Sequence, residues 1–257
     1  MTKKKYKTLP LLEYKVFTGN LTDIDYRNKQ LINTINQYSY CIADNDYKFK
    51  KALQKSDILL PDGIGIVIAA KLLKKQTIQK IAGADIHQYL LEQLNKDHGT
   101  CMYMGASEIT LKKIRERLAK EYPNIKVATY SPPYKPEFSK EDNQAMIAAV
   151  NTHKPYVLFV GMTAPKQEKW AKEHFKELQV GTVCAIGAVF DFYAGTVERP
   201  SPFWIKLGLE WFIRLVKEPK RMWRRYVYYG PFFGFVLLKM GLRIRKRKKN
   251  LRKQRIK

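Results

Sequence analysis

Short apolar segments alternate with longer amphipathic ones along most of this chain, and that alternation restricts the fold more than any other feature of the sequence. Six segments have the length and apolar composition of buried strands: 30–35, 57–60, 100–104, 125–130, 156–160 and 182–186. Five segments repeat apolar residues at helical spacing: 65–74, 86–94, 108–121, 140–151 and 167–178. Residues 12–17 are expected to form an edge strand or a hairpin. The pattern predicts an α/β fold, a Rossmann-like parallel sheet with helices on both faces.

Three glycines directly follow predicted strands and indicate where a ligand would bind. Gly105, Gly161 and Gly187 each end an apolar segment. Parallel sheets bind ligands beyond the carboxyl ends of their strands. A glycine at that position lets backbone N–H groups approach a phosphate or a base closely. We therefore expect these residues in a nucleotide site.

The charge of the chain is unusual in its size and its position. The 257 residues include 48 Lys and Arg against 23 Asp and Glu, a formal net charge of +25. No Asp or Glu follows Glu218, so the excess gathers at the end of the chain. Such a basic tail favours a polyanionic partner, either nucleic acid or anionic lipid.

Cysteine usage and hydropathy are those of a cytoplasmic protein. Cys41, Cys101 and Cys184 are an odd number without metal-ligand spacing, as expected of reduced core residues. No apolar segment follows the basic start of the chain in the manner of a signal peptide. No uninterrupted apolar run reaches the ~18 residues of a transmembrane helix.

Five sequence blocks, in order, resemble the signature blocks of the WecG/TagA/CpsF glycosyltransferases (glycosyltransferase family 26). They are LLPDGIGIV (59–67), IAGADI (81–86), GMTAPKQEKW (161–170), IGAVFDFYAG (186–195), and GLEWFIRL followed by EPKRMWRRY (208–226). The resemblance covers roughly residues 33–226. It implies an enzyme that needs no metal or other cofactor, self-associates, and works on the inner face of the cytoplasmic membrane. Its substrates would be a UDP-sugar donor and a polyprenyl-diphosphate-linked sugar acceptor.

The acceptor side of the predicted site contains Asp62, Thr34 and Asn36. Asp62 follows an apolar segment and precedes a predicted helix, so it is either a helix N-cap or a carboxylate facing the cleft. The family's proposed general base falls on Asp62. Inverting glycosyl transfer needs such a base to take the proton of the acceptor hydroxyl. Thr34 and Asn36 occupy the family's T-x-N positions, and a polar turn at the strand end is their alternative interpretation.

Lys80 and Asp85 flank the glycine of the second block. The family commonly has Arg at position 80, and Lys cannot form the planar bidentate contact that Arg makes with phosphate. A diphosphate-binding role for Lys80 is therefore open. Asp85 fits a helix cap and a ligand contact equally well.

The nucleotide side contains Gln167, Glu168, Phe190 and Asp191. Gln167 and Glu168 follow Pro165 at a predicted helix start, where an amide and a carboxylate could hydrogen-bond to the edge of a uracil base or to ribose hydroxyls. The helix dipole alone also favours Glu at that position. Asp191 is either a partner for a ribose hydroxyl or a second cap.

Cations to neutralise a departing diphosphate are expected from Arg214, Arg221 and Arg224. A helix break is expected near Pro219. A solvated basic face is the alternative for these arginines, but Arg214 and Arg221 fall on family positions.

Two pairs have the D-x-D spacing of metal sites, Asp23 with Asp25 and Asp44 with Asp46, but helix capping is the favoured interpretation.

The predicted organisation is a catalytic domain, 1–196, followed by a membrane-docking appendage, 197–257. Residues 1–98 would form the acceptor half of the domain and residues 99–196 the nucleotide half. In the appendage, residues 226–242 are apolar but interrupted by glycines, a proline and a lysine, and 243–257 are polybasic. We expect this segment to lie on an anionic bilayer. The alternative is a core helix with a disordered tail that attracts RNA.

The predicted function is inverting transfer of an N-acetylmannosamine-type or related hexose from a UDP-sugar to a lipid-linked sugar, in cell-surface polysaccharide or teichoic acid synthesis. A nucleic-acid-binding protein would explain the basic tail but not the glycine-ended strands, so no nucleic-acid partner is expected. A nicotinamide-dependent oxidoreductase lacks support because G-x-G-x-x-G spacing does not follow a first strand.

Overall fold

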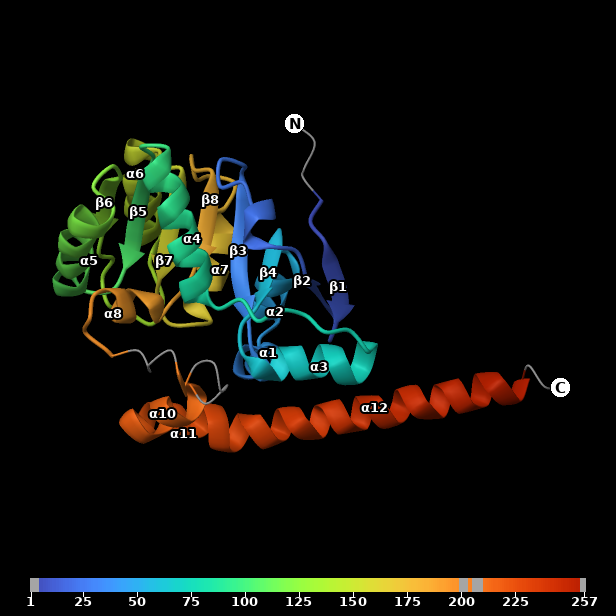
Figure 1. The fold of residues 1–257 in the computed structure, drawn as a ribbon. Coiled ribbons are helices and arrows are strands. Elements are labelled where there is room, and N and C mark those ends of the chain that lie inside the picture. Colours follow the sequence, from blue (N-terminus) through green and yellow to red (C-terminus); the bar gives the residue numbers. More distant parts are fainter. Residues whose placement is uncertain (1–4, 199–202, 205–209, 255–257) are drawn as a thin grey trace.

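The computed structural model describes residues 5–198, 203–204 and 210–254. Its centre is one six-stranded sheet with the order β4-β3-β8-β7-β5-β6, in which every neighbouring pair is parallel (Figure 1). Its strands are β3 (Gln30–Ile35), β4 (Ile58–Pro61), β5 (Thr100–Gly105), β6 (Lys126–Tyr130), β7 (Val157–Gly161) and β8 (Thr182–Ala185). The predicted fold class and the six predicted strands are confirmed.

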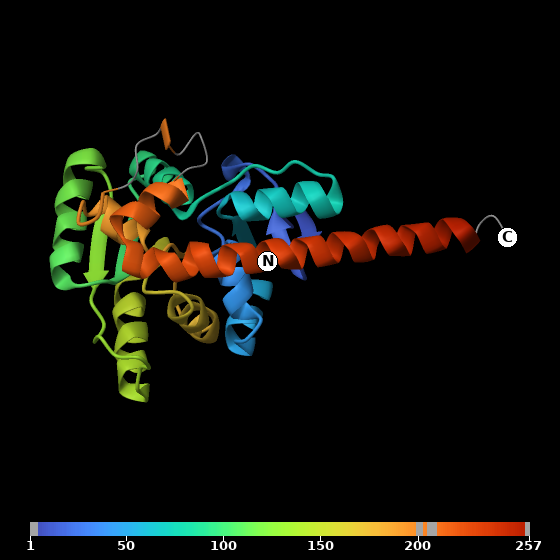
Figure 2. The same cartoon turned by 90° about the horizontal axis from the view of Figure 1, so that it is seen from below.

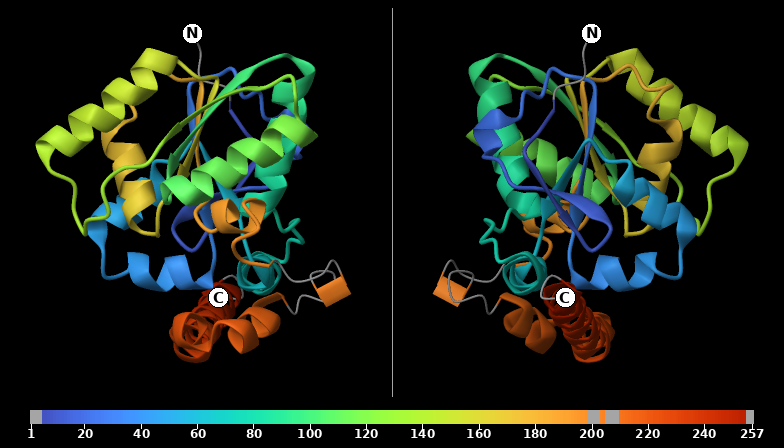
Figure 3. Two further views of the ribbon diagram at one scale, coloured as in Figure 1. Left: turned by 90° about the vertical axis from the view of Figure 1, so that its left-hand side faces the viewer. Right: turned by 90° about the vertical axis from the view of Figure 1, so that its right-hand side faces the viewer.

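Helices cover both faces of the sheet because alternate strand residues point to opposite sides. On one face, Tyr103 and Phe159 pack in a core with α4 (Gly83–Lys96), α5 (Glu108–Glu121) and α8 (Val189–Tyr193). On the other, Met102 and Leu158 pack with α6 (Lys140–His153) and α7 (Lys166–His174). The sheet is seen edge-on, with helices on both sides, in Figure 3.

A third core lies at the β4 edge of the sheet. It contains the antiparallel hairpin of β1 (Thr8–Leu11) and β2 (Tyr14–Phe17), with α1 (Gln37–Ala43), α2 (Tyr47–Gln54) and α3 (Ile64–Lys74). The hairpin matches one of the two predicted forms of residues 12–17. Helix α1 was not predicted, and α2 follows Asp46, where a capped helix was expected.

The appendage consists of α10 (Glu210–Lys217), α11 (Pro219–Trp223), a π-helical turn (Arg224–Tyr228) and α12 (Tyr229–Gln254). Pro219 is the first residue of α11, so the predicted break is confirmed. The glycines, proline and lysine that interrupt the apolar run of 226–242 do not interrupt the backbone helix, because α12 is one helix of 26 residues. Pro231 lies in its first turn, where a missing N–H is tolerated.

Helix α12 runs along the underside of the domain (Figure 1). It contacts α1 and α3, and its Phe233 and Leu237 are buried in the third core. No helix in the described part of the chain is both long enough and apolar enough to span a bilayer.

Candidate active site

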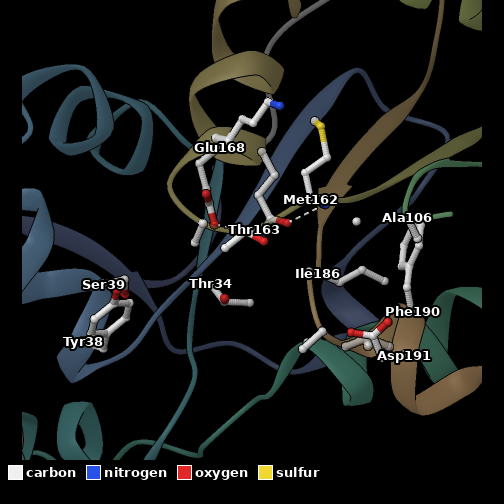
Figure 4. A pocket seen from close by; sticks show the side chains of 18 of the residues that line it. Thr34, Tyr38, Ser39, Ala106, Met162, Thr163, Glu168, Ile186, Phe190 and Asp191 are labelled. Carbon is white, nitrogen blue, oxygen red and sulfur yellow. Dashed lines mark hydrogen bonds between the residues drawn. The ribbon is translucent and has the colours of Figure 1, made fainter. Parts of the chain in front are cut away.

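One cavity of about 1370 Å³ opens at the carboxyl edge of the sheet and receives residues from the ends of all six strands. The appendage closes part of it with Trp211, Lys220 and the π-helical turn. Eleven of the predicted site residues line this cavity: Thr34, Asn36, Asp62, Lys80, Gly161, Gln167, Glu168, Gly187, Phe190, Asp191 and Arg224. The sequence-distant halves of the predicted site thus meet in one space (Figure 4).

Asp62 is held at the end of β4 by the neighbouring strand. Its backbone N–H donates to the carbonyl oxygen of Ile35 at 2.9 Å, continuing the β3–β4 ladder by one residue. Asp62 is not the N-cap of α3, because Gly63 occupies that position. The half-buried Asp62 side chain lines the cavity instead.

Thr34 and Asn36 lie beside Asp62 at the end of β3. Thr34 is paired in register with Leu60, and its side chain lies near the middle of the cavity (Figure 4). Asn36 is the N-cap of α1, since its Oδ1 accepts from the Ser39 N–H at 2.9 Å. The polar-turn interpretation of Asn36 is therefore confirmed, and Asn36 also borders the cavity.

Asp85 and Gly105 are not among the residues that line the cavity. Asp85 is not the N-cap of α4 but its N3 residue, and its Oδ2 accepts from the N–H of the N-cap residue, Ala82, at 2.7 Å. Gly105 has φ +118°, and a Cβ there would lie 2.4 Å from the carbonyl oxygen of Gly161. Gly105 thus permits the close approach of the ends of β5 and β7.

Gln167 and Glu168 form a buried hydrogen-bonded chain at the start of α7. The Met162 N–H donates to Gln167 Oε1 at 3.1 Å, and Gln167 Nε2 donates to Glu168 Oε1 at 2.9 Å. Glu168 is only 3% exposed, and its Oε2 has no hydrogen-bond partner among the described residues. Burial raises the pKa of Glu168 to about 7, although the Gln167 hydrogen bond and the Arg225 charge oppose the rise.

Phe190 and Asp191 follow Gly187 at the end of β8. The Phe190 ring covers Gly161 so closely that a Cβ on that glycine would lie 2.4 Å from the ring. Asp191 is not a helix N-cap, since Ala188 occupies that position in α8. Its side chain lies at the cavity wall beside Phe190 (Figure 4).

Cations from the appendage complete the cavity. Arg224 lines it as predicted, and Arg225, which was not predicted, lies with its guanidinium carbon 4.7 Å from the centre of the Tyr38 ring. Arg214 is on α10 and Arg221 on α11, but their side chains are outside the described part of the structure. The sequence feature that could have indicated Arg225 is its position directly after Arg224 in the segment WRRY (223–226).

A further unpredicted part of the wall is the loop after β6, residues 131–138, with Lys166 of α7 beside it. The Lys166 ammonium lies 3.6 Å from the centre of the Phe138 ring and donates to the carbonyl oxygen of Lys135. Burial lowers the pKa of Lys166. The loop sequence SPPYKPEF is rich in proline and gave no strand or helix pattern.

The D-x-D pairs have structural partners. Asp46 caps α2 by accepting from the Phe49 N–H, and Asp23 accepts from the Asn20 N–H. The capping interpretation of these two residues is confirmed. No cluster of three or more His, Cys, Asp or Glu side chains suited to a metal occurs within the described ranges.

Comparison with known proteins agrees with this geometry. The profile of the Glycosyl transferase WecG/TagA/CpsF family matches residues 12–248. The chain belongs to this family. As a WecG/TagA/CpsF member it is a glycosyltransferase, and the nucleic-acid-binding alternative receives no support.

Three similar proteins in this family carry the same name, N-acetylglucosaminyldiphosphoundecaprenol N-acetyl-beta-D-mannosaminyltransferase. The protein from Bacillus subtilis is 31% identical over 86% of this chain and 87% of its own length. The Bacillus spizizenii protein is 29% identical over 84% and 82%, and the Staphylococcus aureus protein 24% over 86% and 84%.

Proposed function

We propose that this glycosyltransferase moves N-acetylmannosamine, or a closely related hexose, from a UDP-sugar to an N-acetylglucosamine linked to polyprenyl diphosphate, with inversion. The product would enter the synthesis of teichoic acid or another cell-surface polysaccharide. The observation that carries the proposal is the single cavity in which Asp62 and Thr34 face the buried Gln167–Glu168 chain and Asp191. The names of the relatives supply the sugar and the lipid.

In the proposed reaction Asp62 takes the proton of the acceptor hydroxyl. The hydroxyl oxygen forms a bond to the anomeric carbon while the bond from that carbon to the diphosphate oxygen breaks, and UDP leaves. A positioned base of this kind contributes about 10²–10⁴-fold. Lys80, Arg224 and Arg225 border the cavity and would neutralise the departing diphosphate. Arg214 and Arg221 are proposed for the same task from their family positions.

The two halves of the cavity would bind the two substrates. Residues 1–98 provide the ends of β3 and β4 and would bind the acceptor. Residues 99–196 provide the ends of β5 to β8 and would bind the nucleotide through Gly161, Gly187 and Asp191.

Residues 197–257 would dock the enzyme on the inner face of the cytoplasmic membrane. Large apolar side chains are exposed along the appendage, including Phe212, Val216, Trp223, Tyr228, Phe235 and Leu238. Aromatic side chains favour the bilayer interface, and basic residues favour anionic headgroups. Apolar insertion and a basic patch together give stable binding where either alone is weak.

Turnover measurements test the proposed activity. A panel of UDP-sugars is incubated with the full-length protein and a synthetic N-acetylglucosamine linked to polyprenyl diphosphate, and products are identified by mass spectrometry. We expect addition of one hexose unit from UDP-N-acetylmannosamine. Absence of any sugar transfer from every donor, with UDP failing to bind in calorimetry, would contradict the proposal.

A further inference from the structure

Helix α3 exposes a row of aliphatic side chains that the protein core does not explain. Ile64, Ile68 and Leu72 are 45%, 43% and 64% exposed. They are four residues apart, so they follow one face of the helix. The residues of α3 that are buried in the core are others: Ile66, Ala69 and Ala70. A solvated helix face normally carries polar residues, so this row points to an apolar ligand.

The row begins in the active-site cavity. Ile64 lines the cavity, and it is only two residues from Asp62, the proposed base. From there α3 leads away from the sheet toward its end at Lys74 (Figure 1). Leu72 comes eight positions after Ile64, so the row is about 12 Å long at a rise of about 1.5 Å per residue.

Helix α12 lies next to α3 and carries exposed apolar side chains of its own. It contacts α3, and the two helices lie side by side when the molecule is seen from below (Figure 2). At Gly65 a Cβ would be at ordinary contact distance, 3.4 Å, from the ring of Phe233 on α12. Phe235 and Leu238 of α12 are exposed. The α3–α12 face is defined here as Ile64, Ile68 and Leu72 with Phe235 and Leu238.

Charge around the α3–α12 face favours a lipid over a second copy of the chain. Lys71 and Lys75 are exposed on or next to α3, and neither α3 nor α12 contains an Asp or Glu. Two copies of this face would oppose like charges. A lipid that carries a diphosphate would place its anionic group near the cavity cations Lys80, Arg224 and Arg225 and its chain on the apolar row.

We propose that the α3–α12 face holds the first isoprene units of the acceptor's polyprenyl chain. The inference rests on the proposed function, in which the acceptor is lipid-linked. The diphosphate and sugar would occupy the cavity beside Asp62, and the chain would leave past Ile64 and follow α3. The length of the row matches about three isoprene units, so longer chains would gain nothing further from α3 itself.

Acceptors of different chain length test this proposal in detergent, where no bilayer is needed. N-acetylglucosamine diphosphate is linked either to one isoprene unit or to a chain of three or more. For the full-length wild type we expect a lower KM with the longer chain. Ile68→Gln and Leu72→Gln should each raise the KM of the longer acceptor about tenfold, the order expected for losing one aliphatic contact, and leave the short acceptor unchanged. Ile109→Gln, on the 70% exposed Ile109 of α5, is the matched control.

Two results would overturn the proposal: equal KM values for both chain lengths in the wild type, or unchanged KM values in both α3 variants. If no acceptor is glycosylated, the proposed function is contradicted. The proposed lipid-binding role of the α3–α12 face is then tested by a binding measurement alone. In that case farnesyl diphosphate is titrated by calorimetry against isopentenyl diphosphate. Tighter binding of farnesyl diphosphate that Ile68→Gln abolishes supports the apolar row, and equal affinities for the two diphosphates reject it.

Discussion

Two carboxylates at the site have different surroundings, and their chemistry differs accordingly. Asp62 is half-buried at a strand end that faces the cavity. Glu168 is buried, and one of its oxygens is held by Gln167. Burial raises the pKa of Glu168 to about 7. We propose proton abstraction by Asp62 because its side chain lines the cavity at a strand end, whereas Gln167 already donates a hydrogen bond to Glu168.

Replacing Asp62 with Asn should cut turnover by about 10²-fold or more, because the amide cannot take the acceptor proton. UDP affinity should stay nearly unchanged, since Asp62 lies at the end of β4 and the proposed nucleotide residues follow β7 and β8. Single-turnover kinetics and calorimetry measure the two quantities. Retention of more than a third of wild-type turnover, with chemistry rate-limiting, excludes Asp62 as the base.

Glu168 should make the stability of the protein depend on pH. Its pKa is about 7 when folded and near 4.5 when unfolded. Between these values the folded state holds a proton that the unfolded state lacks, so the free energy of unfolding falls as pH rises from about 4.5 to about 7 and levels off above. Glu168→Gln keeps the shape without the titration, so it should remove a decrease of on the order of 3 kcal/mol.

Urea denaturation of both proteins at pH 5, 6, 7 and 8 measures this effect. The difference between the variant and the wild type should grow in favour of the variant up to pH 7 and then remain constant. Parallel pH profiles for the two proteins would show that Glu168 ionises in the folded state as it does in water.

At the scale of elements, close contacts between strand ends and helices shape the nucleotide half. Gly161→Ala should raise the dissociation constant of UDP at least tenfold, because the new Cβ would displace the Phe190 ring, which lies 2.4 Å away, from its place in the cavity wall. Gly241→Ala on α12 is the control, since nothing lies within 4 Å of its Cβ position. Calorimetric titration with UDP measures the dissociation constant for the wild type and both variants. An unchanged affinity for Gly161→Ala means that the Phe190 ring takes no part in the nucleotide site.

The strands were predictable because five of the six are short apolar segments that are mostly buried, with β6 more exposed at the edge of the sheet, and the structure places all six within about one residue of the predicted ends. Helix α1 was not predicted, since it has only seven residues. The continuity of α12 through Pro231 is explained by the position of that proline in the first turn of the helix. The burial of Glu168 and the position of Arg225 depend on tertiary packing, which local sequence patterns do not contain.

At the scale of the whole molecule, the appendage both lines the active-site cavity and forms an apolar and basic surface on the underside of the domain. The π-helical turn contributes Arg224 and Arg225 to the cavity, and α12 continues from it along the underside of the domain (Figure 2). A membrane bound to that underside would therefore meet the same element that lines the site. This arrangement suits an acceptor whose lipid stays in the bilayer.

The double variant Phe235→Gln/Leu238→Gln should bind anionic vesicles at least tenfold more weakly than the wild type. Both side chains are exposed on α12, and each loses apolar insertion on the order of 1 kcal/mol or more. Co-sedimentation with vesicles containing phosphatidylglycerol measures the partition coefficient, with Ile109→Gln as the control on α5. Raising the salt concentration should weaken the wild type as well, because the basic residues of α12 bind by charge. If the double variant sediments like the wild type while salt alone releases both, the appendage binds anionic surfaces by charge only, and its apolar residues have no part in docking.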